Sequence, residues 1–132
     1  MEERQTREFL SRFQVALQGL ADGRYSENQI QRYFESNLSF PVIVGALIAG
    51  VKYDLLSTDS LPSIEVEFTV IEDKFIGFLF GGNVNSQICQ KLDWPLEKVY
   101  QVRNRVRHKL EVYSDYQVVA WEAKRRKDLG KL

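Results

Sequence analysis

The apolar residues of this chain recur mostly at steps of three and four, which is the spacing of one face of an α-helix. The clearest case is the stretch 96–110, where four apolar residues fall on one side: Val99, Val102, Val106 and Leu110. The same stretch holds five residues that are basic or can become so: Arg103, Arg105, Arg107, His108 and Lys109. The pattern predicts a helix that lies on a small core and offers cations to a polyanion.

The N-terminal half shows helical spacing as well. Apolar residues between Thr6 and Leu20 predict a first helix, which Gly23 ends in a left-handed turn. Ser26 and Gln29 have the spacing of a capping box and predict a second helix. Its apolar face consists of Ile30, Tyr33 and Phe34. Residues 1–57 are therefore expected to form a small helical unit with a dimerisation or regulatory role.

The stretch from Phe40 to Val51 predicts a third helix of this unit, with Pro41 in its first turn. It is apolar nearly all round, so we expect it to be buried on most sides. The small residues Gly45 and Ala49 would let another helix approach closely. That second helix belongs either to the same core or to a second copy of the chain.

Residues 58–67 have the composition of an extended linker, and a second domain is expected at 68–132. Thr69 and Glu72 form a capping box, and Gly81-Gly82 ends the helix behind it. A short helix over 86–92, a tight turn at 93–95 and the basic helix to 110 follow. These are the parts of a helix-turn-helix, so the expected fold is all-α, with a helical C-terminal domain.

Composition adds limits to this picture. A chain of 132 residues with 44% hydrophobic content is an ordinary globular protein. Its longest apolar run is too short to cross a membrane, and its start lacks the features of a signal peptide. We expect a cytoplasmic protein that does not contact the membrane.

Charge is distributed unevenly along the chain, although the net charge is zero. Residues 98–132 hold ten basic and four acidic residues, a net charge of +6, and the other 97 residues carry −6. Such asymmetry is typical of a polyanion-binding end joined to another unit. The alternative is a pair of halves that attract each other, or a solvated charged face.

No enzyme is expected. The sequence contains no Gly-rich phosphate loop after a strand, no nucleophile elbow and no cluster of metal-ligating residues, so neither a metal nor another cofactor is predicted. His108, the single histidine, is expected at the surface, and Cys89 is expected to be a small buried thiol.

The stretch from Phe68 to about Leu129 resembles the LuxR/NarL-type helix-turn-helix DNA-binding domain of bacterial transcription regulators. The residues that carry the resemblance are Phe68-Thr69, Glu72, Phe75-Ile76, Phe78-Leu79, Gly82, Asn85, Ile88, Leu92, Val99, Val106, Lys109-Leu110, Val112, Ser114, Gln117, Val118 and Ala120. The N-terminal half has no such resemblance. The resemblance implies a four-helix domain with a fourth helix opening near Ser114. It also implies a sequence-specific DNA-binding transcription regulator with its recognition helix, about 95–110, in the major groove of double-stranded DNA.

The expected DNA contacts are Lys98, Tyr100, Gln101, Arg103, Asn104, Arg107 and His108. Gln101 and Asn104 can pair with adenine, and Tyr100 can reach a phosphate or a thymine methyl group. The basic side chains among these contacts are expected to bind phosphates, whereas Lys109 is expected to lie partly over the core. Asp93 and Glu111 stand where the family usually has glycine, which adds two acids near this surface.

The resemblance also implies a homodimer held by the fourth helix, through Tyr116, Val119, Ala120 and Ala123, unless these residues pack within their own chain. Lys124 to Lys127 would suit the helix dipole or reach the DNA backbone. Two alternatives stay open. The domain could bind a protein partner, such as part of the transcription machinery, instead of DNA. The acidic N-terminal half could also cover the basic half.

Overall fold

The computed structural model describes residues 3–25, 39–62 and 65–132. It contains the helices α1 (Glu3–Ala21), α3 (Phe40–Lys52), α4 (Val70–Phe80), α5 (Asn85–Leu92), α6 (Leu96–Leu110) and α7 (Asp115–Asp128). The described residues include no strand, and the predicted all-α fold is confirmed. The predicted capping box at Ser26 and the apolar face of Ile30, Tyr33 and Phe34 lie outside the described residues.

Local signals account for several helix ends. Thr69 Oγ1 accepts from the Glu72 N–H at 3.2 Å, and Glu72 Oε1 accepts from the Thr69 N–H at 2.8 Å, so the predicted capping box of α4 is confirmed. Gly23 and Gly82 follow α1 and α4 with φ values of 74° and 86°, which is the left-handed region that glycine adopts without strain.

Asp93 and Glu111 have φ values of 54° and 57°, so both adopt the left-handed conformation at the ends of α5 and α6. A Cβ atom is disfavoured in this conformation, so both positions carry a steric cost that glycine would not have.

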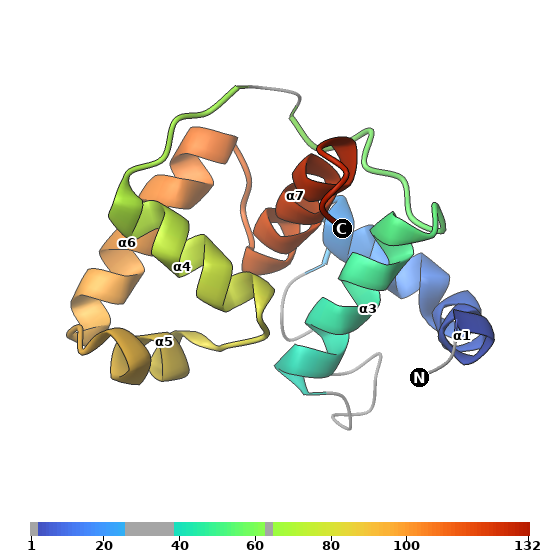
Figure 1. Cartoon of the computed structure of the whole chain (residues 1–132), viewed down its shortest axis with the longest axis horizontal. Coiled ribbons are helices and arrows are strands. Elements are labelled where there is room, and N and C mark those ends of the chain that lie inside the picture. The colour runs from blue at the N-terminus through green and yellow to red at the C-terminus, as the bar shows by residue number, and fades with distance from the viewer. Residues whose placement is uncertain (1–2, 26–38, 63–64) are drawn as a thin grey trace.

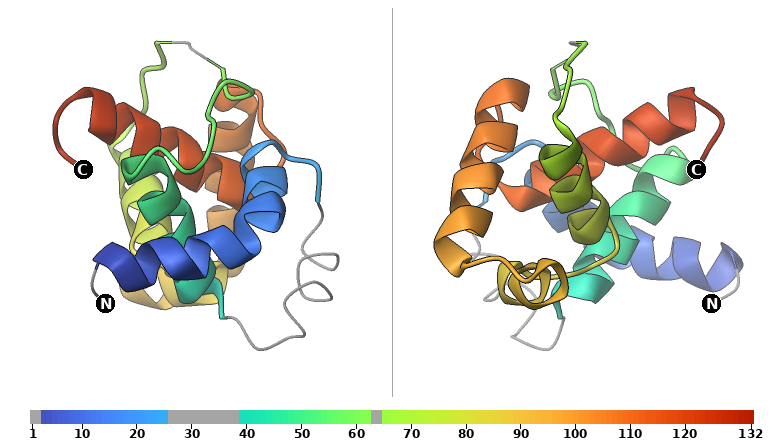
Figure 2. Two further views of the ribbon diagram at one scale, coloured as in Figure 1. Left: turned by 90° about the vertical axis from the view of Figure 1, so that its right-hand side faces the viewer. Right: turned by 60° about the vertical axis from the view of Figure 1, so that its left-hand side comes forward.

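α7 lies between the two halves of the molecule, with α4, α5 and α6 on one side and α1 and α3 on the other (Figure 1). Its most extensive contact is with α3, and it also packs on α4, α1 and α6. α5 packs on α6 (Figure 2), and one cluster of buried apolar side chains runs through all six helices. The division of the chain into units at residues 1–57 and 68–132 stays a prediction.

The core placement of the third predicted helix is confirmed. Six residues of α3 are buried: Ile43, Val44, Ala46, Leu47, Gly50 and Val51. Pro41, Val42 and Gly45 on the other side of the helix are exposed. α3 is therefore a core helix of this chain with one solvent-facing edge.

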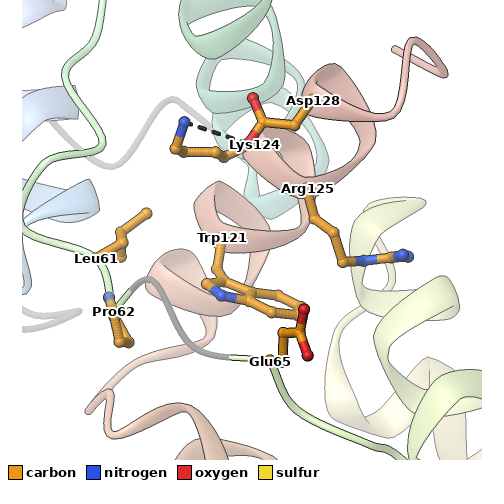
Figure 3. Close-up of a pocket in the computed structure, with 7 residues that line it drawn as sticks. All are labelled: Leu61, Pro62, Glu65, Trp121, Lys124, Arg125 and Asp128. Atoms are coloured by element: carbon orange, nitrogen blue, oxygen red, sulfur yellow. Dashed lines mark ion pairs between the residues drawn. The ribbon is translucent and has the colours of Figure 1, made fainter.

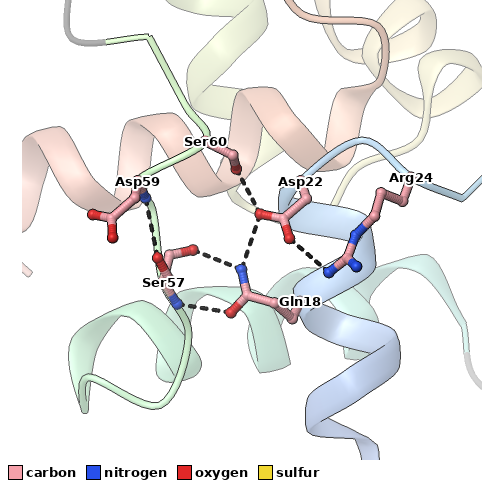
Figure 4. A network of polar contacts seen from close by, with 6 residues as sticks. All are labelled: Gln18, Asp22, Arg24, Ser57, Asp59 and Ser60. Atoms are coloured by element: carbon pink, nitrogen blue, oxygen red, sulfur yellow. Dashed lines mark hydrogen bonds and ion pairs between the residues drawn. The ribbon is translucent and has the colours of Figure 1, made fainter.

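The loop after α3 is fastened to the end of α1 by side-chain hydrogen bonds (Figure 4). The Gln18 amide donates to the Ser57 carbonyl oxygen and accepts from the Ser57 N–H, both at 2.8 Å. Ser60 donates to Asp22 at 2.5 Å, and Arg24 pairs with the same carboxylate at 2.8 Å. These bonds hold the start of the expected linker against the N-terminal helices.

Candidate nucleic-acid interface

α6 is held by its apolar side, as its spacing predicts. Val99, Val102, Val106 and Leu110 have no exposed surface, and the helix packs on α4, α5 and α7. Pro95 precedes the first turn, and the Trp94 N–H closes the preceding turn by donating to the Cys89 carbonyl oxygen at 3.0 Å. α5, the turn at 93–95 and α6 thus form a short helix, a tight turn and a longer helix with one surface left to solvent.

The outer face of α6 is that solvent-exposed surface, formed by Glu97, Tyr100, Gln101, Asn104, Arg105 and His108. Four of the predicted DNA contacts lie on it, and the expected surface position of His108 is confirmed. Lys98 and Arg103 are half-buried at its two edges. α1 and α3 lie at the opposite end of the molecule and leave this face open (Figure 1).

Three of the predicted contact residues touch one another. The Arg103 guanidinium carbon lies 4.6 Å from the centroid of the Tyr100 ring. The same guanidinium donates to Asn104 Oδ1 over 3.3 and 3.4 Å, which are long hydrogen bonds. A cation over an aromatic ring contributes about 0.5–1 kcal/mol at an exposed site. Arg103 is therefore oriented along the edge of the outer face, and Asn104 beside it is exposed.

Lys98 occupies the other edge of α6. Its ammonium group lies 4.6 Å from the centroid of the Trp94 ring, and Trp94 is half-buried against the core. Trp121 also packs within the chain, since it is buried and meets Phe68 edge-on at 5.7 Å.

Arg107 does not point outward. Its guanidinium donates twice to Asp115 Oδ1, at 2.8 and 3.2 Å, and Asp115 is buried at the start of α7. Asp115 lies eight residues further along the chain, beyond the end of α6. The expected phosphate contact of Arg107 would require this pair to open.

Lys109 lies partly over the core, as predicted. Its ammonium group is 2.5 Å from Glu72 Oε1 and 3.2 Å from the Glu67 carbonyl oxygen. Glu72 is only 1% exposed. Burial by itself raises the pKa of Glu72, but the hydrogen bonds from Lys109 and Thr69 and the charge of Lys109 together leave that pKa below its ordinary value.

The cations at the end of α7 are paired within the chain. Arg125 and Arg126 both donate to the buried Glu122, at 2.6 and 2.9 Å, and Glu122 raises the pKa of Arg125. Figure 3 shows Lys124 paired with Asp128, beside a hollow over Trp121. Lys127 binds the Val51 carbonyl oxygen at 2.9 Å and also Asp54. Much of the +6 charge is thus neutralised locally.

The fourth-helix residues expected at a dimer contact are buried inside the chain instead. Tyr116, Val119, Ala120 and Ala123 are each less than a tenth exposed, and Phe40 of α3 meets the Tyr116 ring at 5.6 Å. The alternative of packing within the chain is confirmed for these four residues.

Arg105 and Lys91 are candidate contacts that the sequence reasoning did not select. Arg105 is exposed on the outer face and pairs with no acid in the part of the chain that the structure describes. Arg105 stands four residues after Gln101 and three before His108, which is the spacing of one helix face, so the sequence could have identified it as a contact. Lys91 is exposed on α5 and donates to Asn83 Oδ1 at 2.6 Å, a contact that only the folded chain reveals.

The described residues hold no group of three or more side chains that could bind a metal ion. Among them, no helix is long and apolar enough to span a membrane. Cys89 is half-buried rather than buried, and its thiol donates to the Trp94 carbonyl oxygen. Its position tightens the turn before α6.

The chain matches no protein-family model, and comparisons with curated proteins and with solved structures find no match either. The resemblance to the LuxR/NarL-type domain therefore stays a prediction. Function has to be argued from the geometry of the outer face.

Proposed function

We propose that the chain is a DNA-binding transcription regulator whose outer face of α6 enters the major groove of double-stranded DNA. One observation carries the proposal. α6, which follows the short helix and the tight turn, has its whole outer face exposed to solvent. That face holds the amide side chains of Gln101 and Asn104, with cationic side chains beside them. Helices placed in this way dock in the major groove with their exposed side chains on the base edges.

The side chains divide into two chemical roles. Gln101 and Asn104 can each donate to adenine N7 and accept from its N6 amino group, which the major groove displays. Arg105, Lys98 and Arg103 can contact phosphates on either side of the groove, and such contacts set affinity without reading sequence. Tyr100 lies next to Arg103 and can pack on a thymine methyl group.

A salt titration tests this proposal. The affinity of the full chain for a fluorescent duplex is measured by anisotropy between about 50 and 200 mM salt, where each phosphate contact contributes about −0.9 to the log–log slope. Arg105→Gln should weaken binding and lower the slope by about one contact.

The matched control is Lys52→Gln, which removes an exposed cation from α3, the helix at the opposite end of the molecule from α6 (Figure 1), and should leave the slope unchanged. Absence of binding to any duplex even at low ionic strength would exclude DNA as the ligand.

A specific observation also favours a protein partner. Leu96 and Tyr100, one helical turn apart, are 42% and 40% exposed, and the exposed Glu97 adjoins Leu96 on the same helix. Apolar surface bordered by both signs of charge suits a protein interface. A partner recovered from nuclease-treated lysate by the wild-type chain, but not by Tyr100→Ala, would favour this function.

A further inference from the structure

One side of α7 is occupied along its length by α3 of the same chain. Near the start of both helices, the Phe40 and Tyr116 rings lie 5.6 Å apart. Near their ends, Lys127 donates to the Val51 carbonyl oxygen at 2.9 Å and binds Asp54. Because the starts meet and the ends meet, α3 runs beside α7 in the same direction and covers it from end to end.

The side chains between these two contacts are closely packed. Val119, Ala120 and Ala123 of α7 and Val44 and Leu47 of α3 are almost completely buried. A second chain could reach this side of α7 only if α3 left it, which would expose both apolar faces to water. The surface of α7 that would form a dimer interface is therefore covered by α3 of the same chain.

The exposed large apolar side chains that the structure describes lie on several different elements. Among the described residues, the large ones are Val15, Val42, Val70, Ile71, Leu96, Tyr100, Tyr113 and Leu129. They are divided among α1, α3, α4, α6 and the segments that flank α7. A stable dimer buries about 800 Å² on each partner, usually around a contiguous apolar centre.

We propose that one chain, as a monomer, binds a single asymmetric duplex site through its one α6. The inference rests on the proposed DNA binding and adds the class of site. Operators of dimeric helix-turn-helix proteins are palindromic because the protein has two-fold symmetry. A monomer imposes no symmetry, so its preferred site is not an inverted repeat.

Selection of duplexes from a random library with the full chain, followed by sedimentation velocity, tests the inference. The free chain should sediment as a 15.4 kDa species. The selected duplex should bind one chain, and its motif should lack an inverted repeat. A duplex with two inverted copies, centred about 10 base pairs apart, should bind each chain as tightly as a duplex with one copy.

The possible failures are distinguishable. Two chains per duplex on an inverted repeat, or binding about tenfold tighter to the paired copies than to one copy, would overturn the monomeric mode and leave DNA binding intact. A library from which no duplex is enriched would overturn the proposed function, and this inference with it.

Discussion

The Lys109 ammonium group lies 2.5 Å from the Glu72 carboxylate, which closes the first turn of α4 and is almost completely buried. The pair joins two helices across 37 residues of sequence. It turns one cation of α6 inward and so reduces the charge available to a ligand.

Removal of Lys109 should destabilise the protein, because it leaves a buried carboxylate without its counter-charge. Lys109→Met is expected to lower the free energy of unfolding by about 2–3 kcal/mol, measured by urea denaturation. Lys98→Met is the control, since Lys98 lies over Trp94 on the same helix and should cost less than about 1 kcal/mol. Equal losses for the two variants would contradict the role of the pair.

Glu72 should also make stability depend on acidity. The pKa of Glu72 is lowered in the folded chain. Its contribution to the free energy of unfolding is therefore fully present above the unfolded pKa of about 4.3, and it is lost as pH falls through the lower folded pKa. Urea midpoints should therefore decrease below about pH 5. Glu72→Gln should be less stable at neutral pH and should show a shallower decrease. If the urea midpoint of Glu72→Gln decreased as steeply at low pH as that of the wild type, Glu72 would not be the cause of the pH dependence.

Glycine should be favourable at the end of α6. Glu111 adopts a left-handed backbone with φ of 57°, so Glu111→Gly is expected to raise the free energy of unfolding by about 1 kcal/mol. Glu97→Gly, on the first turn of the same helix, should instead destabilise by about 0.5–1 kcal/mol. Glu111→Gln separates the loss of charge from the change in backbone freedom, and a gain of the same size in that variant would contradict the backbone explanation.

The two predicted classes of DNA contact should separate in binding assays. Gln101→Ala is expected to relax base preference at one position, because it removes an amide that can pair with adenine. Arg103→Ala should weaken all duplexes similarly, since phosphates carry no sequence information. Competition anisotropy against a set of single-base variants of a selected duplex measures both effects. A uniform loss with Gln101→Ala would contradict its assignment as a base contact.

The contact of α3 with α7 should link the stability of the N-terminal helices to that of α6. Leu47→Ala on α3 is expected to cost about 3 kcal/mol and to lower the urea midpoint reported by Trp94 fluorescence in a Trp121→Phe background. Val15→Ala, at a position 70% exposed, should leave that midpoint nearly unchanged. A Trp94 transition that does not respond to Leu47→Ala would mean that the two halves unfold independently.

Features set by nearby residues could be predicted from the sequence. The helix over 96–110, its buried side and the Thr69–Glu72 capping box depend on spacings of three and four, and all three are confirmed. Lys109 could be placed over the core for the same reason, because its side of the helix lies close to the apolar stripe.

Features set by distant residues could not be predicted. Nothing in the spacing of 40–51 indicates that α7 is its partner, since an apolar helix can be covered by any other apolar surface. Arg107 has the spacing of a partly exposed residue, but Asp115 reaches it only after the chain has turned beyond α6. Local spacing and packing describe the chain alone, so neither determines whether the outer face contacts DNA.

The sandwiched position of α7 determines how the molecule can be dissected. A fragment that begins after the linker would lose α3 and leave Tyr116, Val119, Ala120 and Ala123 facing water, and it would self-associate or unfold for reasons unrelated to DNA. A change in binding after such a truncation would therefore not test whether the acidic N-terminal half covers the basic half. Point substitutions that keep both halves together are the experiments that the architecture permits.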